Sequence, residues 1–103
     1  MAITIELWTR NGLVGGAEHW WDDVEVTLRA LDPAQEAFPL LSRVDRYGDA
    51  TFTEAELRPL REELWRLAAT TPPRAVAAIA DKVIELCDAG LAATASELRF
   101  VGD

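Results

Sequence analysis

The chain has 103 residues, half of them hydrophobic, which suits a single folded domain spanning residues 1–103. Eighteen acidic against ten basic side chains give a formal net charge of -8, so binding to nucleic acid or to an anionic membrane is disfavoured. A single cysteine, no apolar run of membrane-spanning length and no basic-then-apolar leader at the start predict a cytoplasmic protein.

The first third of the chain predicts a strand, a turn and a helix. Residues 2–8 alternate between apolar and polar side chains, as in a half-buried strand. Asn11-Gly12 is a turn signal, and Gly15-Gly16 indicates a second break, leaving at most a short strand between them. Residues 18–31 carry apolar side chains at helical spacing, which favours a helix, although a strand stays open because Val24, Val26 and Leu28 also alternate.

The middle of the chain predicts a short helical turn and then a bend. Asp32-Pro33 is typical of a helix start, and Pro39 ends that turn. Residues 42–45 and 50–53 flank a polar tetrapeptide, as the two arms of a small hairpin or extended bend would.

The second half predicts two helices and a final strand. Thr53 and Glu56 form a capping box at the start of a helix that reaches about Ala69, with a kink at Pro59. A second helix follows the two prolines at 72–73 and stops at Gly90. Residues 97–103 read as a strand that pairs with the first one. We therefore expect an α+β fold, in which a small, mostly antiparallel sheet packs against two or three helices.

Catalytic and cofactor signals are weak. Cys87 lies on the apolar stripe of the last helix, where a thiol acts as a small hydrophobe. Glu18-His19 with Asp22 and Asp23 offers metal ligands, but the chain has only this one histidine. The glycines of residues 12–16 lack the lysine and hydroxyl of a phosphate loop. We expect a protein that is not an enzyme and carries no cofactor.

A degenerate calcium loop is the alternative function. Loop positions one, three, five, seven, nine and twelve are filled by Asp45, Tyr47, Asp49, Thr51, Thr53 and Glu56. Ala50 stands where the loop needs glycine, and Tyr47 is a poor ligand, so a calcium-responsive module would depend on Asp45, Asp49 and Glu56. The structural interpretation is a turn followed by a helix cap.

The tryptophans point to a binding surface. Adjacent side chains on a helix cannot both face the core, so at least one of Trp20 and Trp21 is expected to be exposed beside acidic residues. An exposed indole next to carboxylates is typical of a binding hot spot for a basic partner. The predicted partner-binding patch is Trp20, Trp21, Asp22, Asp23 and Glu25. The alternative is that both rings straddle the edge of the core.

Two resemblances bear on function. Residues 39–45, Tyr47-Gly48-Asp49, Phe52 and residues 100–103 together resemble a group of small, uncharacterised acidic proteins from high-GC bacteria. In size, acidity and lack of catalytic apparatus the chain is also similar to cytoplasmic immunity proteins that neutralise secreted toxins. That likeness implies a non-enzymatic protein that blocks a basic toxin domain. The exposed aromatic side chains also leave a homodimer open.

Overall fold

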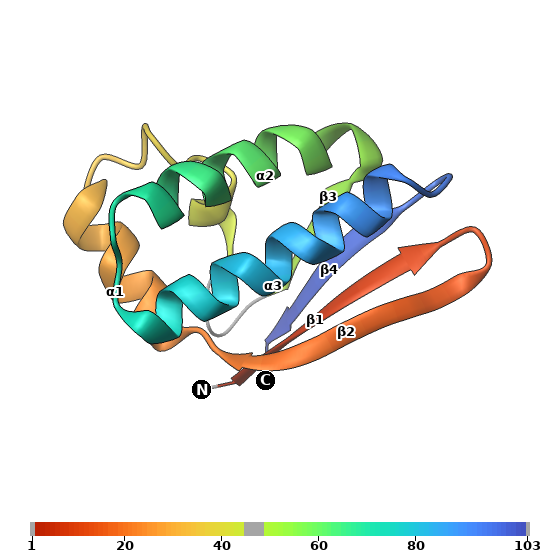
Figure 1. Cartoon of the computed structure of the whole chain (residues 1–103), viewed down its shortest axis with the longest axis horizontal. Helices are drawn as coiled ribbons and strands as arrows, with labels where there is room; N and C mark the ends of the chain where they lie inside the picture. The colour runs from red at the N-terminus through yellow and green to blue at the C-terminus, as the bar shows by residue number, and fades with distance from the viewer. Residues whose placement is uncertain (1, 45–48, 103) are drawn as a thin grey trace.

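The computed structural model describes residues 2–44 and 49–102 and has the predicted α+β architecture (Figure 1). Four antiparallel strands lie in the order β2-β1-β4-β3. Their bounds are β1 Ala2–Thr9, β2 Gly12–Trp20, β3 Ala50–Thr53 and β4 Glu97–Gly102. The helices are α1 Asp22–Leu31, α2 Glu54–Ala69 and α3 Arg74–Leu91, with a short 3-10 helix, η1, at Leu41–Arg43.

The core lies between one face of the sheet and the helices α2 and α3 (Figure 1). Ile3, Ile5 and Leu7 of β1 are fully buried there, whereas the residues between them are only half-buried. The predicted pairing of the last strand with the first is confirmed, because β4 runs antiparallel to β1 with Ile3 opposite Gly102. The alternation of β1 thus separates a covered face of the sheet from an uncovered one.

The second strand is longer than predicted. The sequence suggested a break at Gly15-Gly16 and a helix from residue 18, but β2 continues to Trp20 and α1 begins only at Asp22. The glycines permit this strand, since a Cβ on Gly16 would lie 2.5 Å from the carbonyl oxygen of Ile5. Residues 18–20 were included in the predicted helix because apolar side chains recur at helical spacing over residues 18–31. Pairing with β1 outweighs that pattern and keeps these three residues in the strand.

The segment between α1 and β3 also differs from the prediction. Asp32 does not start a helical turn, because it is the C-cap residue of α1, and its carboxylate accepts hydrogen bonds from the backbone N–H groups of Glu36, Ala37 and Phe38. The strand β3 pairs with β4, and residues 42–43 belong to η1, so the two segments do not pair as a hairpin, which leaves the extended bend as the other arrangement expected. The tip of that bend, residues 45–48, lies outside the described residues.

The two long helices follow the prediction closely. Glu56 accepts a hydrogen bond from the Thr53 N–H at 3.0 Å, which confirms the capping box at the start of α2. The helix α2 runs from Glu54 to Ala69 with Pro59 inside it. Gly90 is not the stop of α3 but lies inside its last turn, where a Cβ would meet the Leu57 side chain at 2.6 Å. The glycine therefore lets α3 pack closely against α2.

Candidate functional site: the open sheet face

The face of the sheet opposite α2 and α3 carries a mixed set of aromatic, apolar and acidic side chains. In the register of the strands, Thr4 lies opposite Glu18 and Val101, and Trp8 lies opposite Leu13 and Glu97. We call this surface the open sheet face and define it by Thr4, Glu6, Trp8, Leu13, Val14, Glu18, Trp20, Glu97, Arg99 and Val101. Three glutamates against one arginine give this set an excess of negative charge.

The neighbouring indoles of Trp20 and Trp21 point to different environments. Trp20 ends β2 opposite Ala2 and is 58% exposed. Trp21 is 0% exposed and packs edge-on against Phe100, with 5.5 Å between the ring centroids. The expectation that at least one indole is exposed is confirmed. Including Trp21 in the contact patch was wrong, because the strand ends between the two residues and the second ring enters the core.

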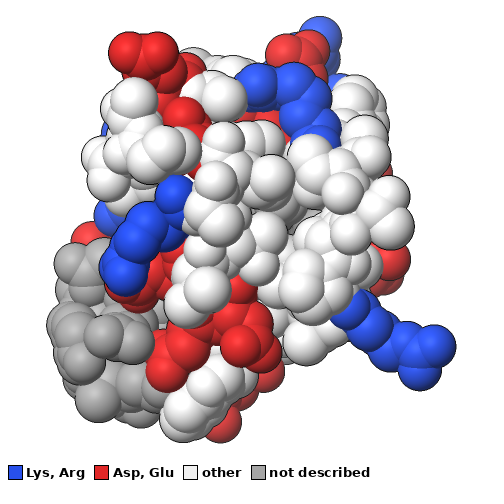
Figure 2. Space-filling view, turned by 90° about the vertical axis from the view of Figure 1, so that its left-hand side faces the viewer, with Lys and Arg blue, Asp and Glu red and all other residues white. Residues whose placement is uncertain are grey.

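The acidic residues of α1 contribute less free charge than the sequence suggested. Asp22, Asp23 and Glu25 all lie in the first turn of the helix, but among these three only Asp23 is exposed, and the other two are half-buried. Glu25 accepts a hydrogen bond from Arg29 at 2.7 Å, which offsets its charge. On the end of the molecule that carries α1, acidic side chains gather on the lower part, and others lie at the upper edge and at the right among basic and uncharged ones (Figure 2). Among these three residues, Asp23 is the one best placed to meet a partner.

A second tryptophan of the open sheet face, Trp8, lies near the end of β1 and contacts charged neighbours. The Trp8 Nε1 donates a hydrogen bond to Glu6 at 3.2 Å, and the Arg99 guanidinium lies 4.6 Å from the centroid of the indole ring. Arg99 also donates to Glu97 at 2.6 Å. The arginine is thus neutralised by its neighbour, which leaves the charges of Glu6 and Glu18 uncompensated within this face. The sequence indicated only part of this cluster, because the alternation of residues 2–8 placed Glu6 and Trp8 on the polar face of the first strand.

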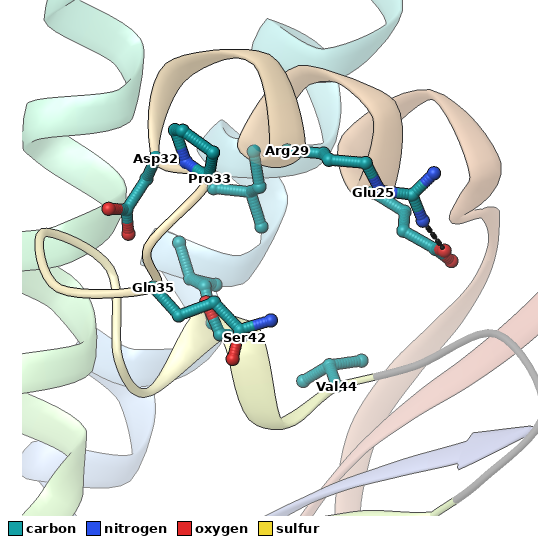
Figure 3. A pocket seen from close by; sticks show the side chains of 9 residues that line it. Glu25, Arg29, Asp32, Pro33, Gln35, Ser42 and Val44 are labelled. Carbon is teal, nitrogen blue, oxygen red and sulfur yellow. Dashed lines mark hydrogen bonds and ion pairs between the residues drawn. The ribbon is translucent and has the colours of Figure 1, made fainter.

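A small hollow beside α1 uses its polar groups for the protein's own contacts. It encloses about 160 Å³ between α1 and the segment leading to η1, and the Glu25–Arg29 pair lies on one side of it (Figure 3). The Asp32 carboxylate points away from the other labelled side chains, and the Ser42 hydroxyl donates to the Phe38 carbonyl at 2.8 Å. A volume below the roughly 300 Å³ of ordinary ligand pockets argues for a structural role.

The environments of Cys87 and His19 favour a structural role over catalysis or metal binding. Burial raises the pKa of the Cys87 thiol to about 12, so the reactive thiolate is scarce at neutral pH. Burial, together with the charge of Lys82, lowers the pKa of His19 and keeps its imidazole neutral. Within residues 2–44 and 49–102, no three His, Cys, Asp or Glu side chains are grouped as a metal site.

The predicted calcium ligands are only partly described. Asp49 accepts a hydrogen bond from the Gly102 N–H at 3.1 Å, and Glu56 serves the capping box and pairs with Arg43 at 2.9 Å. Asp45 and Tyr47 lie outside the described residues. Glu56 thus forms the cap that the turn-and-cap interpretation expects, and Asp49 holds the end of β4, whereas the expected turn itself lies outside the described residues.

No protein-family model matches the chain, and neither a curated protein nor a solved structure matches it. Among the helices that the structure describes, none has the length and apolar character needed to cross a membrane.

Proposed function

We propose that the protein is a non-enzymatic binding protein whose open sheet face engages a basic partner protein, and that it acts as a toxin-neutralising immunity protein. The observation that carries the proposal is the exposed Trp20 indole, which lies on the same face as Glu18 in a molecule of net charge -8. The contact surface is thus centred on the sheet and includes Trp20 and Asp23, with Trp21 supporting it from the core.

Apolar area on this face supports a protein partner. Of the seven large hydrophobic side chains exposed in the described residues, four belong to the open sheet face: Leu13, Val14, Trp20 and Val101. Apolar side chains grouped on one surface are typical of interaction sites, and tryptophan is among the residues that most often dominate binding free energy.

Charge supports a basic partner in particular. The uncompensated Glu6 and Glu18 would attract a cationic surface and repel an acidic one, so they favour one class of partner and speed its approach. The toxin-neutralising role itself rests on the likeness in size and acidity to immunity proteins. Its mechanism would be steric and electrostatic blockade, which needs a firm surface and no catalytic group.

Photo-crosslinking in the native host tests the proposal. A photoreactive phenylalanine analogue is placed at position 20 in one strain and at position 65 in another. Trp65 is the matched control, because it is also half exposed but lies on α2, on the other side of the sheet. We expect a basic protein to crosslink through position 20 only.

Affinity and rescue measurements with the captured protein complete the test. Trp20→Ala should weaken its binding by about thirtyfold, the effect of losing a hot-spot side chain, whereas Trp65→Ala should leave binding unchanged. If the partner is a toxin, co-expression should restore growth with Trp65→Ala and fail with Trp20→Ala. Equal crosslinking from both positions, or an acidic captured protein, would overturn the proposal.

A further inference from the structure

The open sheet face contains a shallow hollow of about 390 Å³ between β1 and β2. Its size is within the range of about 300–1,000 Å³ that is usual for ligand-binding pockets. It is lined by Thr4, Glu6, Leu13, Val14, Gly15, Gly16, Ala17 and Glu18. Because the residues at positions 15–17 have little or no side chain, the hollow opens over the backbone of β2.

The walls of this hollow differ in chemistry. Leu13 and Val14 are 55% and 60% exposed and supply apolar surface beside the strand irregularity between Leu7 and Trp8. Glu6 and Glu18 supply carboxylates, and Thr4 lies opposite Glu18 in the neighbouring strand. None of the described residues that line the hollow is basic. Such a site matches a side chain with an apolar stem and a cationic head.

We propose that this hollow receives an arginine side chain of the basic partner, an inference that rests on the proposed function. The stem lies along Leu13 and Val14, and the guanidinium meets Glu18 and Glu6. A planar guanidinium offers several N–H donors in a fixed fork, which suits acceptors spread over two strands better than the compact ammonium of lysine does. Glu6 accepts a hydrogen bond from Trp8 Nε1, and a carboxylate has further acceptor positions that a guanidinium can use.

Charge complementarity selects this occupant over a second copy of the chain. The strand β2 is an edge strand, and edge strands can pair with a copy of themselves. However, Glu18 is the one acidic residue of β2 and the strand has no lysine or arginine, so pairing with a second β2 would supply no cation to offset Glu18. Each copy also carries a net charge of -8, and a cationic partner relieves the repulsion that self-association would increase.

A titration with a small probe tests the arginine site without the partner. Amide resonances of the full-length protein are followed by NMR while N-acetyl-arginine amide is added, and the titration is repeated with N-acetyl-citrulline amide, which has nearly the same shape and no charge. We expect saturable shifts at Gly15, Gly16 and Glu18 with the arginine compound alone. Glu18→Gln should weaken this binding about tenfold.

Glu62→Gln is the matched control, since Glu62 is an exposed glutamate on α2. It should leave the titration unchanged, and the spectra themselves report whether each variant is folded. The proposal is overturned if citrulline binds equally, if N-acetyl-lysine amide binds more tightly, or if the shifts spread over acidic residues around the whole surface.

Two results distinguish this inference from the proposed function. A partner whose affinity falls with Trp20→Ala but not with Glu18→Gln would contradict the arginine site and leave the binding function standing. A partner insensitive to Trp20→Ala would contradict the function itself. A concentration-dependent dimer in sedimentation that Val14→Lys abolishes would assign the hollow to a second copy and overturn the inference.

Discussion

Glu63 is 3% exposed on the inner side of α2, an unusual place for a carboxylate. Its oxygens accept hydrogen bonds from the backbone N–H groups of Leu40 at 3.1 Å and Leu41 at 3.0 Å. These amides stand at the start of η1, so their hydrogen bonds would otherwise be missing. One buried acid therefore ties the long connection after α1 to α2.

Replacing Glu63 with alanine should lower the free energy of unfolding by about 2–3 kcal/mol, because the buried amide of Leu41 and the half-buried amide of Leu40 lose their acceptor. Urea denaturation followed by tryptophan fluorescence measures the loss. Glu62→Ala, on the exposed side of the same helix, should change stability by less than about 0.5 kcal/mol. Equal losses in the two variants would contradict this role for Glu63.

Asp32 gives the stability a dependence on pH. Burial by itself would raise the pKa of Asp32, but the hydrogen bonds from the backbone of Ala37, Phe38 and Glu36 outweigh burial and lower it. The unfolded chain therefore binds this proton at a higher pH than the folded protein does. The stabilisation is complete above about pH 4 and is lost as the pH falls through the lower pKa of the folded state.

The Asp32→Asn variant should lose less stability than the parent protein when the pH is lowered below about 4. Urea midpoints measured across this range test the expectation. Asp81→Asn, an exposed change on α3, should keep the slope of the parent protein. A parallel pH profile for Asp32→Asn would show that the loop amides do not hold this carboxylate in its charged form.

Among the elements, the position of β2 depends on the close approach of its backbone at Gly16 to the backbone of β1 at Ile5. A Cβ on Gly16 would lie 2.5 Å from the Ile5 carbonyl oxygen, whereas a Cβ on Gly15 would meet Leu86 at an ordinary 3.9 Å. Gly16→Ala should therefore destabilise the protein by about 1–3 kcal/mol through forced displacement of β2 from β1. Gly15→Ala is the control and should cost far less. Thermal unfolding compares the two, and similar midpoints would contradict the argument.

Elements fixed by local signals could be predicted from the sequence, and elements fixed by distant contacts could not. The capping box of Thr53 and Glu56 and the alternation of β1 lie within a few residues of the structure that they specify. The end of β2 is decided by pairing with β1, although its last residues share the helical spacing of α1. The segment around Leu40 is held by Glu63, 23 residues away, and has no local signal.

The candidate site, like the fold, could be predicted only where local sequence determines it. Two adjacent tryptophans required one exposed ring in any regular element, and Trp20 is that ring. Which of the two is exposed depends on the boundary between β2 and α1, which the sequence placed wrongly. The contribution of Trp8, Glu6 and Arg99 could not be found either, because it requires β1 and β4, which are far apart in the sequence, to lie side by side.

The whole molecule carries a charge of -8, and the proposed partner is basic. Raising sodium chloride from about 0.05 to 0.5 M should slow their association by about tenfold and change dissociation much less, because salt screens the long-range attraction. Stopped-flow mixing of the protein with the purified partner that the crosslinking experiment identifies measures both rates. An association rate that does not change with salt would contradict electrostatic steering.

The two ends of the chain leave the sheet together, where Ile3 lies opposite Gly102 at the meeting of β1 and β4 (Figure 1). Tension applied between the ends acts along the hydrogen bonds that join these two central strands, because such bonds are perpendicular to antiparallel strands. The bonds then break one after another like a zip, instead of bearing the load jointly as in shear. The sheet therefore offers little mechanical resistance, and an unfolding motor that grips both ends would open the core from its middle.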